Sequence, residues 1–494
     1  MRAGTRRAVW ALGIVVAILV IVVGTGVLAL RPPTLAVPSQ GLVLSEVTVV
    51  DPGRDRRAKQ TVSVEGEKIA RIAESTVQES AGTNTGRFAG AYVLPGLIDM
   101  HVHFMSYPDR DLFALLFLAH GVTTVRDTGN FDGSIWQTQQ AILAGQIPGP
   151  RIFACGPILD GDPPVWPQSR VVRTAEEAEA AVAEAAAHGA NCIKAYSLLS
   201  PQALTAIHQA AAKRGLPVIG HVPLAVPFEQ AHLTDVQHLT GVPPLFQIPT
   251  TDFIRAIATA WHALDATRSD AIIRASVEQN IAHTPTLVVA ERLSRLLELQ
   301  QNNDATSHLL PRYYRELLWN PQEGLPYMRG TSAQDAEALK QEIPKMKQFV
   351  RRLHQAGVRI HAGTDTPNPF VVPGASLQEE LRLLVEAGFT PEEAWIAATR
   401  TAGESLREPK LGSIEEGAPA DFLIFRDDPT KDLAALATLE AVVAQGRLYP
   451  KETLDQALTR WRRHFDNPLY DAVSMAIARF MMKRMFTRAL TTEE

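Results

Sequence analysis

Short apolar runs that alternate with helical stretches are the feature that most limits the fold of this chain. From Gly96 onward the runs are rich in Val, Ile and Leu, and amphipathic stretches such as residues 176–190 and 200–215 separate them. Strands buried on both faces and separated by helices are typical of a parallel sheet, so the pattern predicts an α/β fold, a (β/α)8 TIM barrel. The predicted strands lie within residues 93–106, 121–129, 151–159, 191–197, 216–223, 234–241, 282–289 and 358–366.

Strand-like segments also flank this region on both sides. Their similar texture, for example in residues 42–53 and 411–429, predicts that both chain ends build one small β module. The stretch 290–356 is longer than one barrel helix needs, which predicts a helical insertion over the active-site face. The predicted domains are a membrane anchor or signal segment (1–36), a composite β domain (37–94 and 405–450), the barrel (95–404) and a basic helical extension (451–494).

The N-terminus predicts a transmembrane helix. Basic residues precede Ala8–Leu30, which holds no charged residue and is long enough to cross a hydrocarbon core. Because only Arg31 follows closely, we expect a cytoplasmic N-terminus and an exported, periplasmic or otherwise extracytoplasmic body. Val27–Ala29 is compatible with a cleavage site, so a secreted protein without this segment stays open as the alternative.

The C-terminal tail beyond Thr453 is helical and basic in pattern. Ile477, Phe480, Met481 and Met485 share one helical face, with Arg479, Lys483 and Arg488 elsewhere. Such a helix is compatible with a membrane surface, with packing on the body or with a partner subunit, and homo-oligomers are therefore compatible with the sequence.

Charge and cysteine content limit the partners and the metal sites that this chain can have. The net charge of -5 gives no nucleic-acid footprint. The two cysteines, Cys155 and Cys192, lie far apart in strand-like runs, which indicates neither a disulfide framework nor a thiolate zinc cluster. Any metal must therefore be held by His, Asp, Glu or Lys.

Polar side chains stand at the ends of the predicted strands. His101 and His103 are two positions apart in one strand, so their imidazoles face the same side and form half of a site for a divalent metal. Each polar residue alone has a structural explanation, such as a core histidine or a helix cap at Asp365. Together they point to a site, because the C-terminal ends of barrel strands meet at one rim. The residues at those ends are His101, His103, Lys194, His221, His238 and Asp365.

These motifs and their order resemble the metal-dependent amidohydrolase superfamily, in its imidazolonepropionase-like and Xaa-Pro dipeptidase-like branch. The segments that carry the resemblance are LPGLIDMHVH, GVTTVRD, Lys194, His221, His238, GTD and AATRTAGESL followed by LGSIEEGAPADFLIF. The resemblance covers about residues 41–450 and implies a distorted barrel beside a β-sandwich built from both chain ends.

The resemblance also implies a centre of two divalent metals, with zinc expected. His101, His103 and Asp365 would hold the first ion, and His221 and His238 the second. Lys194 would bridge them as a carbamate, formed after the amine has lost its proton beside the cations.

The implied reaction is hydrolysis of a carbon–nitrogen bond in a small molecule or short peptide by metal-bridging hydroxide, with Asp365 as general base and acid. The sequence leaves two alternatives open. The same centre could act as an esterase, lactonase or phosphotriesterase, or the chain could be a non-catalytic, membrane-tethered binding barrel.

Other polar residues have less defined roles. Tyr196 and His283 are candidates for substrate contact, and His361 is expected lower in the barrel as a core or second-shell histidine. Arg126 and Asp127 are expected to form a structural pair. The segments GHVPLAVP and QHLTG depart from the pattern of dipeptidase-like members, which puts a dipeptide substrate in doubt but keeps both histidines.

Overall fold

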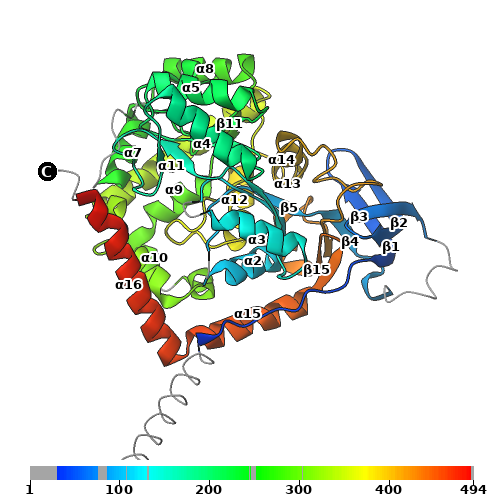
Figure 1. Cartoon of the computed structure of the whole chain (residues 1–494). Coiled ribbons are helices and arrows are strands. Elements are labelled where there is room, and N and C mark those ends of the chain that lie inside the picture. Colours follow the sequence, from blue (N-terminus) through cyan, green and yellow to red (C-terminus); the bar gives the residue numbers. More distant parts are fainter. Residues whose placement is uncertain are drawn as a thin grey trace, which may run out of the picture.

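The computed structural model describes residues 30–75, 86–106, 108–130, 133–243, 245, 252–302 and 304–490. In this part of the chain a barrel of parallel strands lies beside a seven-stranded sheet, with helices around the barrel (Figure 1). The α/β barrel predicted from the sequence is therefore present.

Strands from both chain ends join in the seven-stranded sheet, in the order β16-β15-β14-β4-β1-β2-β3. Strand β4 runs parallel to β1 and antiparallel to β14, so it connects the two chain ends in one sheet. The resemblance implied a β-sandwich at this place, whereas the described strands form a single seven-stranded sheet. Phe422 and Ile424 pack in this domain's own core, whereas Leu423 and Phe425 pack against the barrel, because successive strand residues face opposite sides. The strands are β1 (Leu42–Asp51), β2 (Asp55–Glu65), β3 (Lys68–Glu74), β4 (Tyr92–Pro95), β14 (Phe422–Phe425), β15 (Leu439–Ala444) and β16 (Arg447–Pro450).

The barrel wall consists of two parallel sheets, β5-β6-β7 and β13-β12-β11-β10-β8-β9. The predicted strand 151–159 is split between them, into β7 and β8. Gly156 has a φ of 79° and Pro157 lacks an N–H, so the ladder is interrupted there. The strands are β5 (Leu97–Val102), β6 (Val122–Asp127), β7 (Arg151–Ala154), β8 (Ile158–Asp160), β9 (Arg170–Val171), β10 (Ile193–Ala195), β11 (Val218–Gly220), β12 (Asp235–Gln237) and β13 (Ala282–Thr284).

The last predicted strand, 358–366, closes the barrel without forming a regular ladder. Its described pairings are isolated bridges from Ile360 to His283 and from Thr366 to Val102. Backbone hydrogen bonds still join it to both neighbours, since His361 N donates to His283 O (2.9 Å) and Asp365 N donates to His101 O (2.7 Å). Asp365 itself has a φ of 61°, which breaks the extended conformation that a ladder needs.

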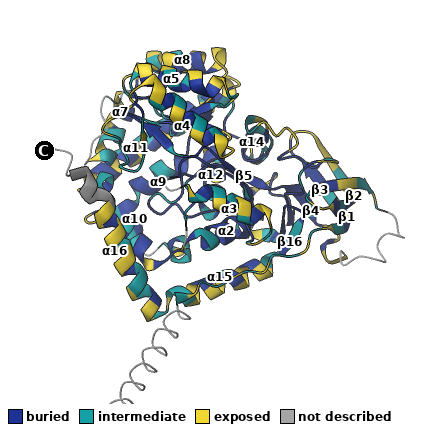
Figure 2. Cartoon of the chain, in the orientation of Figure 1, coloured by how far each residue is buried: buried dark blue, intermediate teal, exposed yellow. Residues whose placement is uncertain are grey.

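The barrel helices bury one face and expose the other, as α4 and α5 show in Figure 2. Thr174 begins α4 with a capping box to Glu177, which satisfies backbone donors of the first turn. The helices around the barrel are α2 (Arg110–Ala119), α3 (Ser134–Leu143), α4 (Ala175–Ala187), α5 (Pro201–Ala212), α6 (Phe228–Ala231), α7 (Phe253–Ala263), α8 (Ala266–Glu278), α12 (Ala375–Glu386), α13 (Pro391–Ala397) and α14 (Arg400–Ser405), with short turns η2 (Gly86–Phe88) and η6 (Leu433–Thr438).

A helical insertion reaches over the C-terminal ends of the strands. Trp319 Nε1 donates to Pro367 O (3.1 Å), and the Tyr327 hydroxyl donates to Asn368 Oδ1 (2.9 Å). These contacts hold the loop that follows Asp365. The insertion comprises α9 (Leu287–Ser294), α10 (Leu296–Asn302), η3 (Ala305–Leu309), η4 (Tyr314–Leu318), η5 (Pro326–Met328) and α11 (Ala333–Gln355).

The C-terminal extension forms two helices, α15 (Lys451–Phe465) and α16 (Pro468–Leu490), and α15 packs against α2. The predicted membrane segment Ala8–Leu30 falls almost entirely outside the described residues. Among the helices that the structure does describe, none combines the length and apolar character that crossing a bilayer requires.

The two cysteines form a disulfide, Cys155–Cys192. The spacing of the cysteines predicted no disulfide framework, and this prediction was wrong for this pair. The structure supplies the reason: Asn191 N donates to Ala154 O (2.8 Å), so the end of β7 lies against the segment before β10 and brings the two residues together.

Candidate metal centre

Asp365 is the point on which three histidines converge. Its Oδ1 lies 3.3 Å from His101 Nε2 and 3.2 Å from His103 Nε2, and its Oδ2 lies 3.5 Å from His238 Nε2. Ligand atoms of His101, His238 and Asp365 all lie within 4.8 Å of one another. The predicted residues at the ends of β5, β12 and the closing segment therefore share one site.

The other two predicted ligands border this cluster. His221 follows β11, and its ring centroid lies 5.0 Å from that of His238. Lys194 in β10 is fully buried, and its charge lowers the pKa values of His101, His221 and His238 in addition to the larger effect of burial. Lys194 therefore lies in the same space as His101, His221 and His238.

Three histidine rings are oriented by hydrogen bonds at Nδ1, the ring nitrogen that points away from the centre of the cluster. His103 Nδ1 lies 2.9 Å from Gly129 O, and because a carbonyl only accepts, Nδ1 carries a proton and donates it, which leaves Nε2 to face Asp365. His221 Nδ1 shares a hydrogen bond with Ser197 Oγ (2.9 Å), and His238 Nδ1 shares one with Thr286 Oγ1 (2.7 Å). Such outer contacts fix metal-ligating imidazoles and raise their basicity.

Unpartnered nitrogens show that the residues fit a metal. His221 Nε2 and His101 Nδ1 are buried and make no hydrogen bond. Leaving buried polar atoms unpaired is costly, and such atoms are rare in folded proteins. Imidazole nitrogens with a carboxylate are also the donor set that zinc accepts when thiolates are absent.

Backbone strain gathers around the same cluster. Asp365 (φ 61°), His238 (φ 56°) and Thr286 (φ 47°) all lie in the left-handed region that favours glycine. Strained non-glycine residues tend to occur where a side chain must point in one functional direction.

Electrostatics fixes the protonation of the cluster. Burial alone would raise the pKa of Asp365, but His238 and His101 lower it well below the ordinary range, so the carboxylate is ionised. Burial lowers the pKa of His238 to about 4, so this imidazole is neutral at pH 7. For His103 the effect of burial is outweighed by its hydrogen bond to Asp365, which raises the pKa.

Lys194 is poised between its charged and neutral forms. Burial lowers its pKa to about 7, with Asp365 opposing and Arg126 adding to the shift. Its Nζ donates to Gln237 Oε1. A large share of the amine is therefore unprotonated at neutral pH, which is the form that can react with carbon dioxide.

Of the two predicted substrate contacts, Tyr196 lies beside the centre. Its ring stacks on His221 with centroids 4.0 Å apart, and its hydroxyl accepts from Trp166 Nε1 (2.9 Å). His283 does not join the cluster. Its Nε2 shares a hydrogen bond with Ser276 of α8 (2.9 Å), because Thr284 takes the inward position of β13 and its neighbour must face out.

The lower barrel contains a separate buried network. His361 lies there, as expected for a core residue, with Nε2 2.8 Å from Ser405 Oγ. Arg126 pairs with Asp235, whereas Asp127 accepts from Phe104 N (2.8 Å), so the expected pair of Arg126 with Asp127 was wrong. Adjacent strand residues point to opposite sides and cannot readily pair with each other.

Several supporting residues were not identified from the sequence. Asp99 is fully buried and accepts from Thr364 Oγ1 (2.7 Å) and Thr364 N (3.0 Å), which ties β5 to the segment that carries Asp365. Its position two residues before His101, on the same strand face, was the available signal. Ser197 and Thr286 left no such signal, because hydroxyls follow strands in many proteins.

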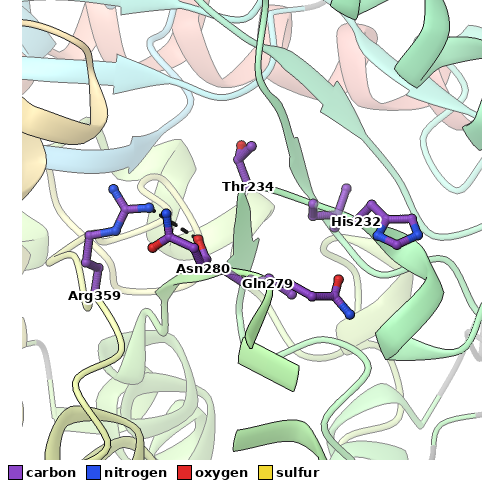
Figure 3. Close-up of a pocket in the computed structure, with 7 residues that line it drawn as sticks. His232, Thr234, Gln279, Asn280 and Arg359 are labelled. Carbon is purple, nitrogen blue, oxygen red and sulfur yellow. Dashed lines mark hydrogen bonds between the residues drawn. The ribbon is translucent and has the colours of Figure 1, made fainter. Parts of the chain in front are cut away.

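A hollow on the opposite side of the barrel has no part in this site. It lies before β12 and β13, where Thr234 and Asn280 line it, and Arg359 donates to Asn280 O (3.2 Å) (Figure 3). The predicted ligands do not line it.

Comparisons with known proteins agree with this architecture. The model of the amidohydrolase family matches residues 92–448. An imidazolonepropionase of Photorhabdus laumondii subsp. laumondii is 40% identical over 83 residues, which are 16% of this chain and 20% of that protein. The chain thus spans about a fifth of the length of the curated relatives it matches.

Solved structures share the fold. Bottromycin amidohydrolase has a TM-score of 0.68 at 22% identity, covering 89% of this chain and 93% of that one. A Xaa-Pro dipeptidase has a TM-score of 0.58 at 21% identity, covering 83% and 100%.

Proposed function

Because the chain belongs to the amidohydrolase family over residues 92–448, we propose that it hydrolyses a carbon–nitrogen bond in a small molecule or short peptide with the aid of two divalent metal ions. The observation that carries the proposal is the convergence of His101, His103 and His238 on the ionised carboxylate of Asp365. Zinc is the expected metal, because imidazole nitrogens and carboxylate oxygens are the ligands of many catalytic zinc sites.

In this proposal each predicted ligand keeps its role. His101, His103 and Asp365 would hold one ion, and His221 and His238 would hold the other. Lys194, as a carbamate, would supply further oxygen ligands. Its pKa of about 7 supports this step, since the neutral amine is accessible without extreme pH.

Divalent ions bound here would acidify water and polarise the scissile carbonyl. Asp365 would take the proton from the attacking water and deliver it to the leaving nitrogen. Ser197, Thr286 and Gly129 would keep the imidazoles in position, and Trp319 and Tyr327 would hold the loop after Asp365.

We also propose that the body is exported, as the sequence of the N-terminus predicts. The disulfide Cys155–Cys192 supports this location, because disulfides persist in oxidising compartments and are rare in reducing ones.

Elemental analysis of the purified chain, of Lys194→Ala and of Lys213→Ala tests the function. Lys213 is the matched control, since its side chain is 66% exposed and pairs with Glu179. We expect about two metal equivalents in the wild type and the control, and loss of most metal and activity in Lys194→Ala.

A substrate panel separates the alternatives. Turnover of dipeptides or N-acyl amino acids supports the proposal, whereas turnover of lactones alone supports an esterase-type activity. Bound metal without any turnover would favour a binding barrel. A wild-type protein without metal, before any chelator, would contradict both enzymatic functions.

A further inference from the structure

The last helix, α16, carries an apolar surface that the body does not cover. The large apolar side chains that are exposed in the described part of the chain are Leu143, Leu198, Val277, Leu469, Ile477, Phe480 and Met481. The last four lie on α16, whereas the others are scattered over separate elements. Phe480 is 62% exposed and Met481 58%, which is unusual for side chains of this size.

Three of these residues are neighbours and the fourth, Leu469, lies on the same exposed side nearer the start of the helix; we call the four the α16 stripe: Leu469, Ile477, Phe480 and Met481. Positions 477, 480 and 481 are spaced i, i+3 and i+4, so their side chains are neighbours on one helical face. The opposite face packs on the body through Met475 and Met482, which are 7% and 9% exposed. The helix is thus apolar on two faces, and only one of them has a partner in the chain.

The α16 stripe is held outward by an ion pair and a ring contact at the start of the helix. Arg312 of the insertion forms an ion pair with Asp471 (2.6 Å), and Tyr470 packs against His464 with centroids 4.2 Å apart. Both contacts fix the rotation of α16 about its axis. Figure 2 shows exposed residues along the outer side of this helix.

The basic residues of α16 indicate what kind of surface the α16 stripe contacts. Between Ala472 and Leu490 the sequence contains Arg479, Lys483, Arg484 and Arg488 and no acidic residue, although the whole chain has a net charge of -5. Exposed Arg479 and Lys483 flank the α16 stripe. Arg484 lies on the stripe's own face, at i+7 from Ile477. A second copy packed symmetrically on this face would bring like charges together, which disfavours a dimer.

A bilayer with anionic lipid matches both properties. Basic helices with exposed aromatic and aliphatic side chains bury the apolar face at the headgroup boundary, while their cations contact anionic headgroups. The sequence places an uncharged segment of membrane-spanning length, Ala8–Leu30, directly before the body. Arg447 Nη1 donates to Pro38 O (2.9 Å), so the chain that leaves this segment is fixed to β16, the strand that leads into α15 and α16.

We propose that α16 is an interfacial membrane-docking helix, whose exposed stripe inserts into the surface of a bilayer that contains anionic phospholipid. It orients the barrel on the membrane and is a contact separate from the N-terminal segment.

A dye attached at position 481 of the full chain tests this. Met481→Cys can be labelled selectively, because the native cysteines are paired with each other. Val277→Cys is the matched control, since Val277 is 49% exposed on α8, which lies away from α16 (Figure 1). Both proteins are reconstituted into vesicles of phosphatidylcholine with phosphatidylglycerol, into vesicles of phosphatidylcholine alone, and into detergent.

We expect a blue shift of the dye and a several-fold drop in quenching by aqueous iodide at position 481 in the anionic vesicles. Position 277 should stay fully quenched. Adding Ile477→Gln and Phe480→Gln should abolish the effect at position 481, whereas adding Val277→Gln should preserve it.

Equal quenching at both positions would overturn the proposal even if the chain stays in the vesicles, because the N-terminal segment would then be the sole anchor. Protection that also occurs in detergent and grows with protein concentration would overturn it in favour of contact between copies. Protection of equal size in neutral and anionic vesicles would overturn the role of anionic lipid.

Discussion

The carboxylate of Asp365 lies 3.2 Å from Nε2 of His103, which donates from its other nitrogen to the carbonyl of Gly129. The bond to Gly129 occupies Nδ1 of His103 and leaves Nε2 facing the ionised carboxylate of Asp365. Because the same Oδ1 also lies 3.3 Å from His101, one carboxylate orients both imidazoles at the C-terminal end of β5.

Asp365→Asn should therefore abolish activity while the fold is preserved. The amide keeps the shape of the side chain but loses the negative charge that a cation and a transferred proton both require. We expect kcat to fall about a thousand-fold or more, together with reduced metal content, measured by steady-state kinetics and elemental analysis. Asp427→Asn, an exposed change elsewhere, is the control. Asp365→Asn with wild-type turnover would rule out the proposed role.

Ser197→Ala should weaken metal binding without unfolding the barrel. Ser197 Oγ is the hydrogen-bond partner of His221 Nδ1, and losing such a contact typically lowers metal affinity about 10–100-fold. Ser294→Ala removes a comparable buried hydroxyl, which donates to Glu291 O (2.8 Å), and serves as the control. Competition with a chromogenic chelator measures the affinity, and equal affinities in the two variants would contradict the role of Ser197.

The sequence predicted the barrel and the position of the cluster because both depend on strand order. Apolar runs identify the strands, and parallel strands bring their carboxyl ends to one rim, so His101, Lys194 and His238 could be associated without knowing any distance. The prediction of the closing strand was less accurate, because an apolar pattern does not indicate the left-handed φ of Asp365.

Side-chain direction within a strand was the main source of error. His283 was expected to face the substrate but faces α8, and Arg126 was expected to pair with Asp127 but points to the other side of the strand. An error of one residue in a strand reverses the direction assigned to a side chain. Partners distant in sequence were also missed. Arg126 pairs with Asp235, 109 residues away, and Cys155 pairs with Cys192 only because two strands meet.

Replacing the disulfide with Cys155→Ala and Cys192→Ala should destabilise the protein. The bond closes a loop with a sequence separation of 37, and removing such a cross-link costs about 2–4 kcal/mol through the entropy of the unfolded chain. Denaturant unfolding of the double variant and the wild type measures the difference. Thiol titration of the unreduced wild type is the companion measurement, and two reactive thiols there would refute the pairing.

Stability should fall with increasing pH because of Glu380, a fully buried residue of α12. Its carboxylate accepts from Leu287 N (3.0 Å) and Val288 N (2.7 Å) at the start of α9, yet burial raises its pKa from 4.5 to about 8. The folded protein therefore binds this proton more tightly than the unfolded chain. The free energy of unfolding should decrease as the pH rises above about 4.5 and level off above about 8, by up to about 1.4 kcal/mol per pH unit. Glu380→Gln, which cannot ionise, should show a shallower slope than the wild type, because the buried Asp99, whose pKa is raised to about 7, still titrates in this range, whereas Glu386→Gln, an exposed change in the same helix, should keep the wild-type slope. Denaturant unfolding of the three proteins across this range measures the slopes, and identical slopes for wild type and Glu380→Gln would show that Glu380 does not titrate there.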